Sequence, residues 1–164
     1  MTRRQILIES MRSTLRDLAR LLRPVSAGQA LWRPAPDAWC IAEVVAHLAY
    51  VEPRYLARLR RVVAEDTPAV EYIDDPGGHD LARPLDEHLQ EFVARREETV
   101  AFLRGLRQAD WGRRLVHPVY GLGRLRDHVQ IFVAHDNEHL EQIVQLREQL
   151  DIHPIPQGED AALS

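Results

Sequence analysis

Apolar residues recur every three to four positions in four long segments of this 164-residue chain. That period places the apolar side chains on one face of an α-helix, and such a face has to be buried against other helices. The segments cover residues 2–23, 40–63, 84–107 and 124–150. The sequence therefore predicts an all-α protein, a four-helix bundle, and no segment shows a pattern typical of a β-strand.

The connection between the second and third segments is the longest break in the pattern. It reads EDTPAVEYIDDPGGHDLARP and contains three prolines and two glycines. A connection of this length can cross over along the bundle, so that the second and third helices would run parallel. The chain length fits one domain, expected over residues 1–150, followed by a C-terminal tail at residues 151–164.

Composition excludes some classes of protein. The net charge is −4, and the basic residues, all of them Arg, are scattered rather than gathered in a stripe, which argues against nucleic-acid binding. No apolar run approaches the roughly 20 residues that span a bilayer, and the N-terminus does not resemble a secretory signal. We therefore expect a cytoplasmic protein that binds neither nucleic acid nor membrane.

Two histidines, His135 and His139, lie four positions apart in the predicted helical stretch VAHDNEHLEQI. They share one helix face, which also carries Phe132 and Ile143 and so points partly inward. An unpaired buried donor or acceptor costs about 1–3 kcal/mol, so two buried imidazoles need partners. A divalent cation would satisfy both at once; the alternatives are separate hydrogen bonds or exposure at the edge of the face.

A third candidate ligand, His47, lies in EVVAHLAYVE on the second predicted helix. Zinc sites need three or four ligands, and sites in bundles draw them from facing helices. One histidine from the second helix and two from the fourth would leave one coordination position open. His128, seven residues before His135, is the second choice for a ligand. The remaining histidines lack ligand spacing and are expected in loops, in the tail or on the surface: His79, His88, His117 and His153.

Two blocks of the sequence resemble the DinB/YfiT-like family of metal-binding helical bundles. The block WCIAEVVAHL resembles the family's Trp-Ser-x-x-Glu-hydrophobic-x-x-His-Leu run, and HDNEHLEQI resembles its His-Asp-x-x-His-x-x-Gln-Ile run. The resemblance extends over nearly the whole chain, to about residue 150. It implies a four-helix bundle with a long crossover and a metal triad of His47, His135 and His139. Zinc is the expected ion, and nickel or iron would suit three imidazoles as well.

The chain departs from the family pattern at Cys40, where Ser is usual. Ser would form a capping box with Glu43, and Cys is a weaker cap that loses about 1 kcal/mol of helix stability. A reactive thiolate at this helix start is one alternative. A small buried side chain is the usual state of a lone Cys, and we expect that state here.

The resemblance also implies a function. Related members use low-molecular-weight thiols such as bacillithiol or mycothiol, as S-transferases or as a maleylpyruvate isomerase. We therefore expect a metal-dependent enzyme that uses such a thiol to conjugate or transform small electrophiles, with a metal-dependent hydrolase less favoured. The alternatives are a non-catalytic metal- or ligand-binding stress-response protein and a helical scaffold with structural histidines. A homodimer is expected by family analogy, and no catalytic side chain is identified.

Other polar and aromatic residues have secondary expectations. Asp136 either orients an imidazole of the triad or faces solvent. Glu91 and Arg95 are spaced to form an ion pair on the outer face of the third helix. Three loop tryptophans are expected to plug the ends of the bundle: Trp32, Trp39 and Trp111.

Overall fold

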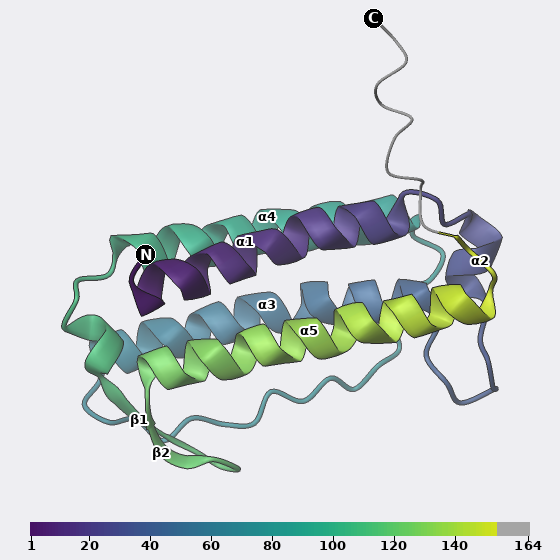
Figure 1. Cartoon of the computed structure of the whole chain (residues 1–164). Coiled ribbons are helices and arrows are strands. Elements are labelled where there is room, and N and C mark those ends of the chain that lie inside the picture. Colours follow the sequence, from purple (N-terminus) through teal and green to yellow (C-terminus); the bar gives the residue numbers. More distant parts are fainter. Residues whose placement is uncertain (154–164) are drawn as a thin grey trace, which may run out of the picture.

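Four long helices form the bundle that the apolar periodicity predicts (Figure 1). They are α1 (Arg3–Leu22), α3 (Ile41–Ala64), α4 (Leu85–Gly105) and α5 (Leu125–Gln149). The structure is a computed structural model, and it describes residues 1–153. Most of the predicted tail lies outside the described residues, so the division of the chain at residue 150 stays a prediction.

The long crossover is present between α3 and α4. Residues 65–84 form no helix and no extended sheet strand, and they run along the outside of the bundle beside α3 and α5 (Figure 1). The crossover returns the chain to the end at which α3 begins. As a result α3 and α4 run parallel, while α1 and α5 run in the opposite direction (Figure 1). This arrangement places the crossover alongside α3 and α5.

The helix ends follow local chemistry. Thr2 caps α1 in a capping box with Gln5, where each side chain bonds the other residue's backbone N–H. Pro84 occupies the N-cap of α4, and α3 continues through Pro53 to Ala64. These ends lie within about two residues of those expected from the periodicity.

The prediction of a loop over residues 108–123 is wrong in part, because this segment contains most of a β-hairpin. Strand β1 (Arg114–His117) pairs antiparallel with β2 (Gly121–Arg124), and Gly121 has a positive φ of 68° at the turn. Each strand has only four residues, too few to show a clear alternation of apolar and polar positions. Two short helices were also not predicted: α2 (Ala27–Leu31) and the 3₁₀ helix η1 (Asp110–Gly112).

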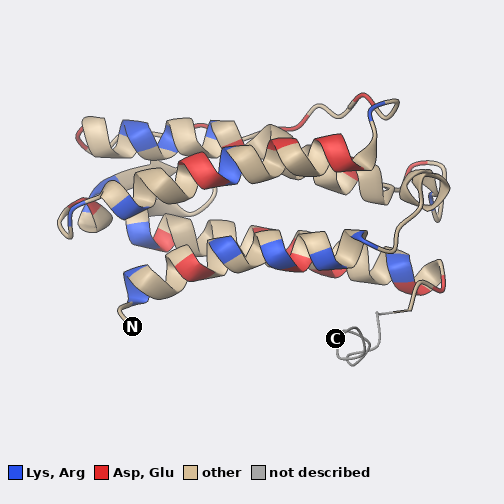
Figure 2. Ribbon diagram, turned by 90° about the horizontal axis from the view of Figure 1, so that it is seen from above, with Lys and Arg blue, Asp and Glu red and all other residues tan. Residues whose placement is uncertain are grey.

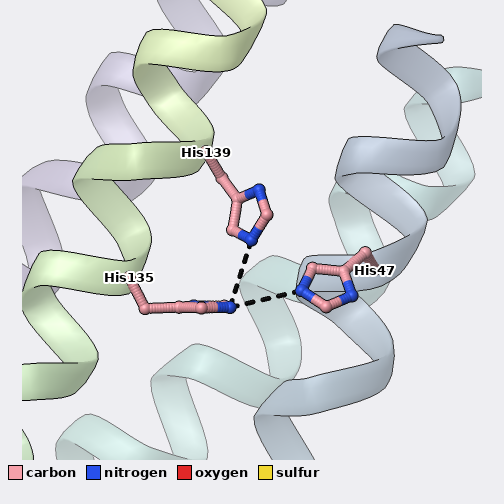
Figure 3. Close-up of side chains that lie close together, drawn as sticks. All are labelled: His47, His135 and His139. Carbon is pink, nitrogen blue, oxygen red and sulfur yellow. Dashed lines mark hydrogen bonds between the residues drawn. The ribbon is translucent and has the colours of Figure 1, made fainter. Parts of the chain in front are cut away.

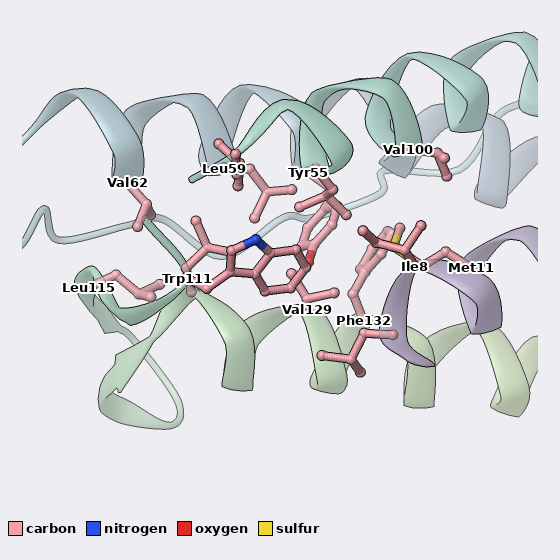
Figure 4. Packing of buried hydrophobic residues seen from close by; sticks show 14 of the residues in the cluster. Ile8, Met11, Tyr55, Leu59, Val62, Val100, Trp111, Leu115, Val129 and Phe132 are labelled. Carbon is pink, nitrogen blue, oxygen red and sulfur yellow. The ribbon is translucent and has the colours of Figure 1, made fainter. Parts of the chain in front are cut away.

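The core extends the length of the bundle. At one end Trp111 of η1 packs in a cluster with Tyr55 and Leu115, as Figure 4 shows. Trp111 thus closes that end as predicted, whereas Trp32 is 37 % exposed and does not act as a plug. A second cluster, at the other end, is built around fully buried residues such as Phe92 and Ile143.

The outer faces of the helices carry charges of both signs (Figure 2). The predicted Glu91–Arg95 pair does not form. Glu91 pairs instead with Arg83 at 2.8 Å, and Arg95 lies 3.8 Å from Glu98. The crossover brings Arg83 within reach of Glu91, which the spacing along one helix does not reveal. None of the described helices is long and apolar enough to span a membrane.

Candidate metal centre

The three histidines that the sequence singles out converge between α3 and α5 (Figure 3). The Nε2 atom of His135 lies 3.2 Å from Nε2 of His47 and 3.1 Å from Nε2 of His139. One ring nitrogen of each residue lies within 4.8 Å of the other two. We call these three residues the triad.

Aromatic rings hold the triad imidazoles in place. Trp39 stacks on His139 with ring centroids 6.3 Å apart, and it also contacts His47 at 5.0 Å. On the other side Phe132 stacks on His135 at 5.4 Å. The rings are therefore fixed by apolar contact, and Trp39, expected as a plug of the bundle end, lies against the candidate site.

A carboxylate from the crossover orients His47. Oδ2 of Asp75 accepts from Nδ1 of His47 at 2.6 Å and from Nε2 of His79 at 2.9 Å. Burial raises the pKa of Asp75, but hydrogen bonds from the Gly77 amide, His47 and His79 outweigh this effect and lower it overall. Asp75 is thus an anionic acceptor that holds the His47 proton on Nδ1 and leaves the Nε2 lone pair facing the triad.

The second ring is oriented from its own helix. Oε1 of Gln142 accepts from Nδ1 of His139 at 2.9 Å, which leaves a lone pair on Nε2 of His139. The third ring has no such partner, since the buried Nδ1 of His135 forms no hydrogen bond within residues 1–153. Gln142 belongs to the family run quoted above, whereas nothing in the local sequence pattern marked Asp75 as a contact of His47.

These tautomers leave the triad unsatisfied on its own. Lone pairs from His47 and His139 both face Nε2 of His135, which can donate a proton to only one of them. The other lone pair would then face a ring nitrogen about 3 Å away with no proton between the two atoms. A cation removes the conflict by accepting all three. Tetrahedral zinc with bonds of 2.0–2.1 Å places its ligand nitrogens about 3.3 Å apart. This is close to the two separations measured from Nε2 of His135. The residues therefore fit a metal ion.

Two of the three triad imidazoles are also held in the uncharged form that a metal requires. Burial lowers the pKa of His135 to about 3, with smaller contributions from His139, His47 and Arg96. Burial likewise lowers the pKa of His47, although Asp75 opposes the shift. Protons therefore compete only weakly with a metal at neutral pH.

A cavity of about 370 Å³ leads away from the triad. His47 and His135 line one part of it, and Arg58, His117 and His128 line another. Apolar side chains of α3, α5 and the crossover form its walls: Val51, Tyr55, Ile73, Ile131 and Phe132. Its volume is in the range of small-molecule sites.

The other histidines take different positions. His128 is buried in the cavity but lies outside the triad, with Nε2 accepting from Arg58 at 2.9 Å, so the structure does not place it as a replacement ligand. His117 lies in β1 and is buried rather than in a loop. His88 was expected on the surface, and this is wrong: it is 3 % exposed and Nε2 contacts the Asp80 carbonyl. His79 lies in the crossover, and His153 is exposed.

Asp136 meets neither of its two expectations. It is fully buried and accepts from Arg96 at 2.7 and 2.9 Å, in a network that also includes Glu52. The apolar periodicity does not reveal this cluster, because Arg96 occupies a buried position of α4 where an apolar side chain is expected.

Cys40 is buried at the N-cap of α3, as expected. Its backbone N–H donates to Glu43 at 2.9 Å as one half of a capping box, and the Cys40 sulfur, a weak acceptor, faces the Glu43 amide as the other half. Burial raises the pKa of the Cys40 thiol, which argues against a reactive thiolate.

Known proteins with similar sequences include one described as metal-dependent. Residues 10–143 match the model of the DinB superfamily. A protein of Oceanobacillus iheyensis described as "Putative metal-dependent hydrolase OB0782" is 24 % identical over 153 residues, which cover 89 % of each chain. The uncharacterized protein YuaE of Bacillus subtilis is 24 % identical over 136 residues, covering 73 % of this chain and 83 % of its own.

A solved structure shares the fold. YfiT from Bacillus subtilis, described as a probable metal-dependent hydrolase with an unusual four-helix bundle topology, superposes with a TM-score of 0.80. The match covers 90 % of this chain and 87 % of YfiT at 19 % sequence identity. At that identity the likeness establishes the fold alone.

Proposed function

This chain belongs to the DinB superfamily, and on that premise we propose that it is a metal-dependent enzyme acting on small molecules. The observation that carries the proposal is the convergence of three imidazole Nε2 atoms beside a cavity of about 370 Å³. Without a cation the three lone pairs conflict, and with one they become a ligand set that opens toward a substrate-sized space.

Each residue of the site has a distinct role in this proposal. His47, His135 and His139 would hold the ion, zinc being the first choice and nickel or iron the alternatives. Asp75 and Gln142 keep the ring protons on Nδ1, so that Nε2 is free to coordinate. When bound, such an ion supplies Lewis-acid chemistry, either polarising a substrate oxygen or lowering the pKa of a nucleophile.

Hydrolysis is the first candidate reaction. OB0782 is described as a "putative metal-dependent hydrolase" and YfiT as a "probable metal-dependent hydrolase", and both resemble this chain over most of its length. Three histidine ligands leave a position for water in catalytic zinc sites. The apolar walls of Val51 and Phe132 would exclude bulk water from the rest of the substrate.

Thiol transfer is the second candidate. The related DinB/YfiT-like members that use low-molecular-weight thiols suggest it, and one feature of the site favours it. Within residues 1–153 no carboxylate forms a hydrogen bond with an Nε2 atom of the triad. A thiol that is ionised at a metal needs no protein base before it attacks an electrophile, so this chemistry requires no role for Glu138, the carboxylate that lines the cavity.

One assay separates these candidates. Protein purified without a histidine tag would be stripped with a chelator, reloaded with zinc, and supplied with a nitrophenyl ester or an electrophilic aromatic chloride. Turnover of the ester without thiol indicates hydrolysis, whereas conjugation that requires bacillithiol or mycothiol indicates transfer. Either activity should disappear in His135→Ala and survive in His153→Ala, which removes an exposed imidazole. Metal binding without either activity would favour the non-catalytic binding protein instead.

A further inference from the structure

The part of the cavity lined by Arg58 holds a cation without a counter-ion. Nη1 of Arg58 donates to Nε2 of His128 at 2.9 Å, and Nη2 donates to the Glu71 carbonyl. No carboxylate of the described residues lies within 4.0 Å of this guanidinium, whereas Arg61, one turn further along α3, pairs with Glu65 at 2.8 Å. Arg58 is half-buried, and its charge faces the cavity uncompensated.

Two histidines beside Arg58 add hydrogen-bond donors. Nδ1 of His117 accepts from the backbone amides of Val119 and Tyr120 at 3.1 and 3.3 Å, so its proton is on Nε2. His128 accepts from Arg58 through Nε2, so its proton is on Nδ1. The two rings lie 5.3 Å apart, and neither N–H has an acceptor within residues 1–153.

This group of side chains suits an anion and not a second metal. The lone pair of each imidazole is already used, by the Arg58 guanidinium in one ring and by backbone amides in the other. Only N–H groups and one positive charge remain to meet a ligand. Burial and the nearby Arg58 lower the pKa of both His117 and His128, so an added cation would be unfavourable here.

Positions along the two helices give the distance between the triad and the group formed by Arg58, His117 and His128. On α3, His47 and Arg58 are eleven residues apart, which is three turns and about 16 Å along one face. On α5, His128 and His135 are seven residues apart, or about 10 Å. Most side chains between them that line the cavity are apolar, among them Val51 and Phe132, and the exception is Tyr55, whose buried hydroxyl has no partner within residues 1–153. The cavity therefore has two polar regions with an apolar section between them.

We propose that Arg58, His117 and His128 form a subsite for the carboxylate or phosphate group of a small substrate whose reacting group lies at the triad. This inference rests on the proposed function for the role of the triad, but the subsite itself consists only of side chains of this chain. It defines the substrate class as small molecules with an anionic group and an apolar segment between that group and the reacting bond. Arg58 then acts as a positioning and specificity residue.

The test is an NMR titration at pH 7 of the metal-free, chelator-treated protein. Succinate and inorganic phosphate are the two anionic probes, and uncharged succinamide is the control ligand. We expect saturable shifts of the His117 and His128 ring signals with at least one anion and none with succinamide. The anion that binds more tightly, succinate or phosphate, shows whether the subsite prefers a carboxylate or a phosphate group. No saturable shift with either anion, or an equal response to succinamide, would overturn the proposal.

Variants locate the binding. Arg58→Gln should weaken anion binding at least about tenfold, because a charge-assisted hydrogen bond is lost, whereas Arg58→Lys should retain most of it. Arg54→Gln is the matched control, since Arg54 lies one turn away on α3 and is exposed outside this cavity. Circular dichroism establishes that each variant is folded. If a variant does not fold, the comparison of the anions with succinamide on the unaltered chain still tests the proposal. Equal affinities in Arg58→Gln and Arg54→Gln would contradict the assignment.

The metal-free titration also separates this proposal from the proposed function. Anion binding at Arg58 in a chain that binds no metal would disprove the metal-dependent enzyme and leave the subsite standing. Conversely, anion-induced shifts that occur only in the zinc-loaded protein, and only at the triad rings, would indicate ligation of the ion and disprove the subsite.

Discussion

Two clusters of buried ionisable side chains lie next to each other on α5, and their hydrogen bonding differs sharply. Asp136 belongs to a network in which all the N–H groups of Arg96 are used, by Glu52, by Asp136 and by the Met11 carbonyl. His135, the preceding residue, has an Nε2 that faces two lone pairs and a buried Nδ1 that has no partner in the part of the chain that the structure describes.

The difference indicates what each cluster is for. Arg96, Glu52 and Asp136 are all 0 % exposed and satisfy one another, so they need nothing from outside the chain. A buried charge is tolerated when it is paired and hydrogen-bonded. The triad cannot satisfy itself, and the missing partner has the chemistry of a cation. We therefore assign a structural role to the Arg96 network and a ligand-binding role to the triad.

The largest expected effect comes from breaking the satisfied cluster. Arg96→Met leaves Glu52 and Asp136 buried without their cation, which should lower the free energy of unfolding by about 3–5 kcal/mol. Urea denaturation of the metal-free protein measures this. Arg95→Met, on the exposed side of the same helix, should stay within about 0.5 kcal/mol of the unaltered chain. Similar free energies of unfolding for the two variants would contradict a stabilising role for the Arg96 network.

The second-largest effect is expected from zinc binding to the triad, and it depends on the zinc concentration. Zinc at a hundredfold excess over its Kd should raise the free energy of unfolding by about 2.7 kcal/mol, because it binds the folded state alone. His135→Ala should lose this gain while His153→Ala keeps it. Urea curves with and without zinc give both values, and an undiminished gain in His135→Ala would place the metal elsewhere.

A smaller effect is expected from the residue that orients His47. Asp75→Asn removes the anionic acceptor of the Nδ1 proton, so metal affinity should fall about 10–100-fold, as is typical when such a partner is lost. Competition with a chromogenic chelator measures the affinity. Asp74→Asn, at the preceding position, has no contact with the triad within the described residues and serves as the control; equal losses in both variants would remove Asp75 from the site.

The pH dependence of stability tests whether His128 is neutral in the folded chain. The pKa of His128 is lowered to about 3, mainly by burial, so protons bind the unfolded chain more readily than the folded one. Its contribution to stability is complete above the unfolded-state value of about 6.5 and declines as the pH falls from there toward 3. In His128→Gln the loss of stability between pH 6.5 and 4.5 should be smaller by about 1–2 kcal/mol. Urea midpoints across this range test it, and identical profiles would contradict a neutral buried His128.

The smallest effect is expected at the start of α3. Cys40→Ser would supply the hydroxyl of a capping box with Glu43 but would bury a polar group, so the two changes should offset each other to within about 1 kcal/mol. Zinc content should not change. Thermal unfolding and metal analysis provide the check, and loss of zinc would show that Cys40 takes part in the site after all.

The fold could be predicted from the sequence because its signals are local and repeated. Four apolar stripes define the four helices, and the proline- and glycine-rich break defines the crossover. The hairpin was missed because four-residue strands carry little periodic signal, and Leu115 is the only strongly buried apolar residue in it. The homodimer stays a prediction.

The site could be predicted only in part. His135 and His139 are visible through their spacing, and His47 through the run that resembles the DinB/YfiT-like family. Asp75 and Arg58 could not be found in this way, since their roles depend on where the crossover lies and on which charges lack partners. Both are properties of contacts between distant segments, and no spacing along one helix reveals them.

We infer that His47, His135 and His139 hold one metal ion. The metal content of untagged protein, together with X-ray absorption of the bound ion, tests this assignment. We predict one divalent ion per chain, with three imidazole nitrogens at roughly 2.0–2.1 Å if it is zinc, and its loss in both His47→Ala and His135→Ala. A chain that takes up no divalent ion, or variants that retain the same ion with the same coordination, would contradict the account.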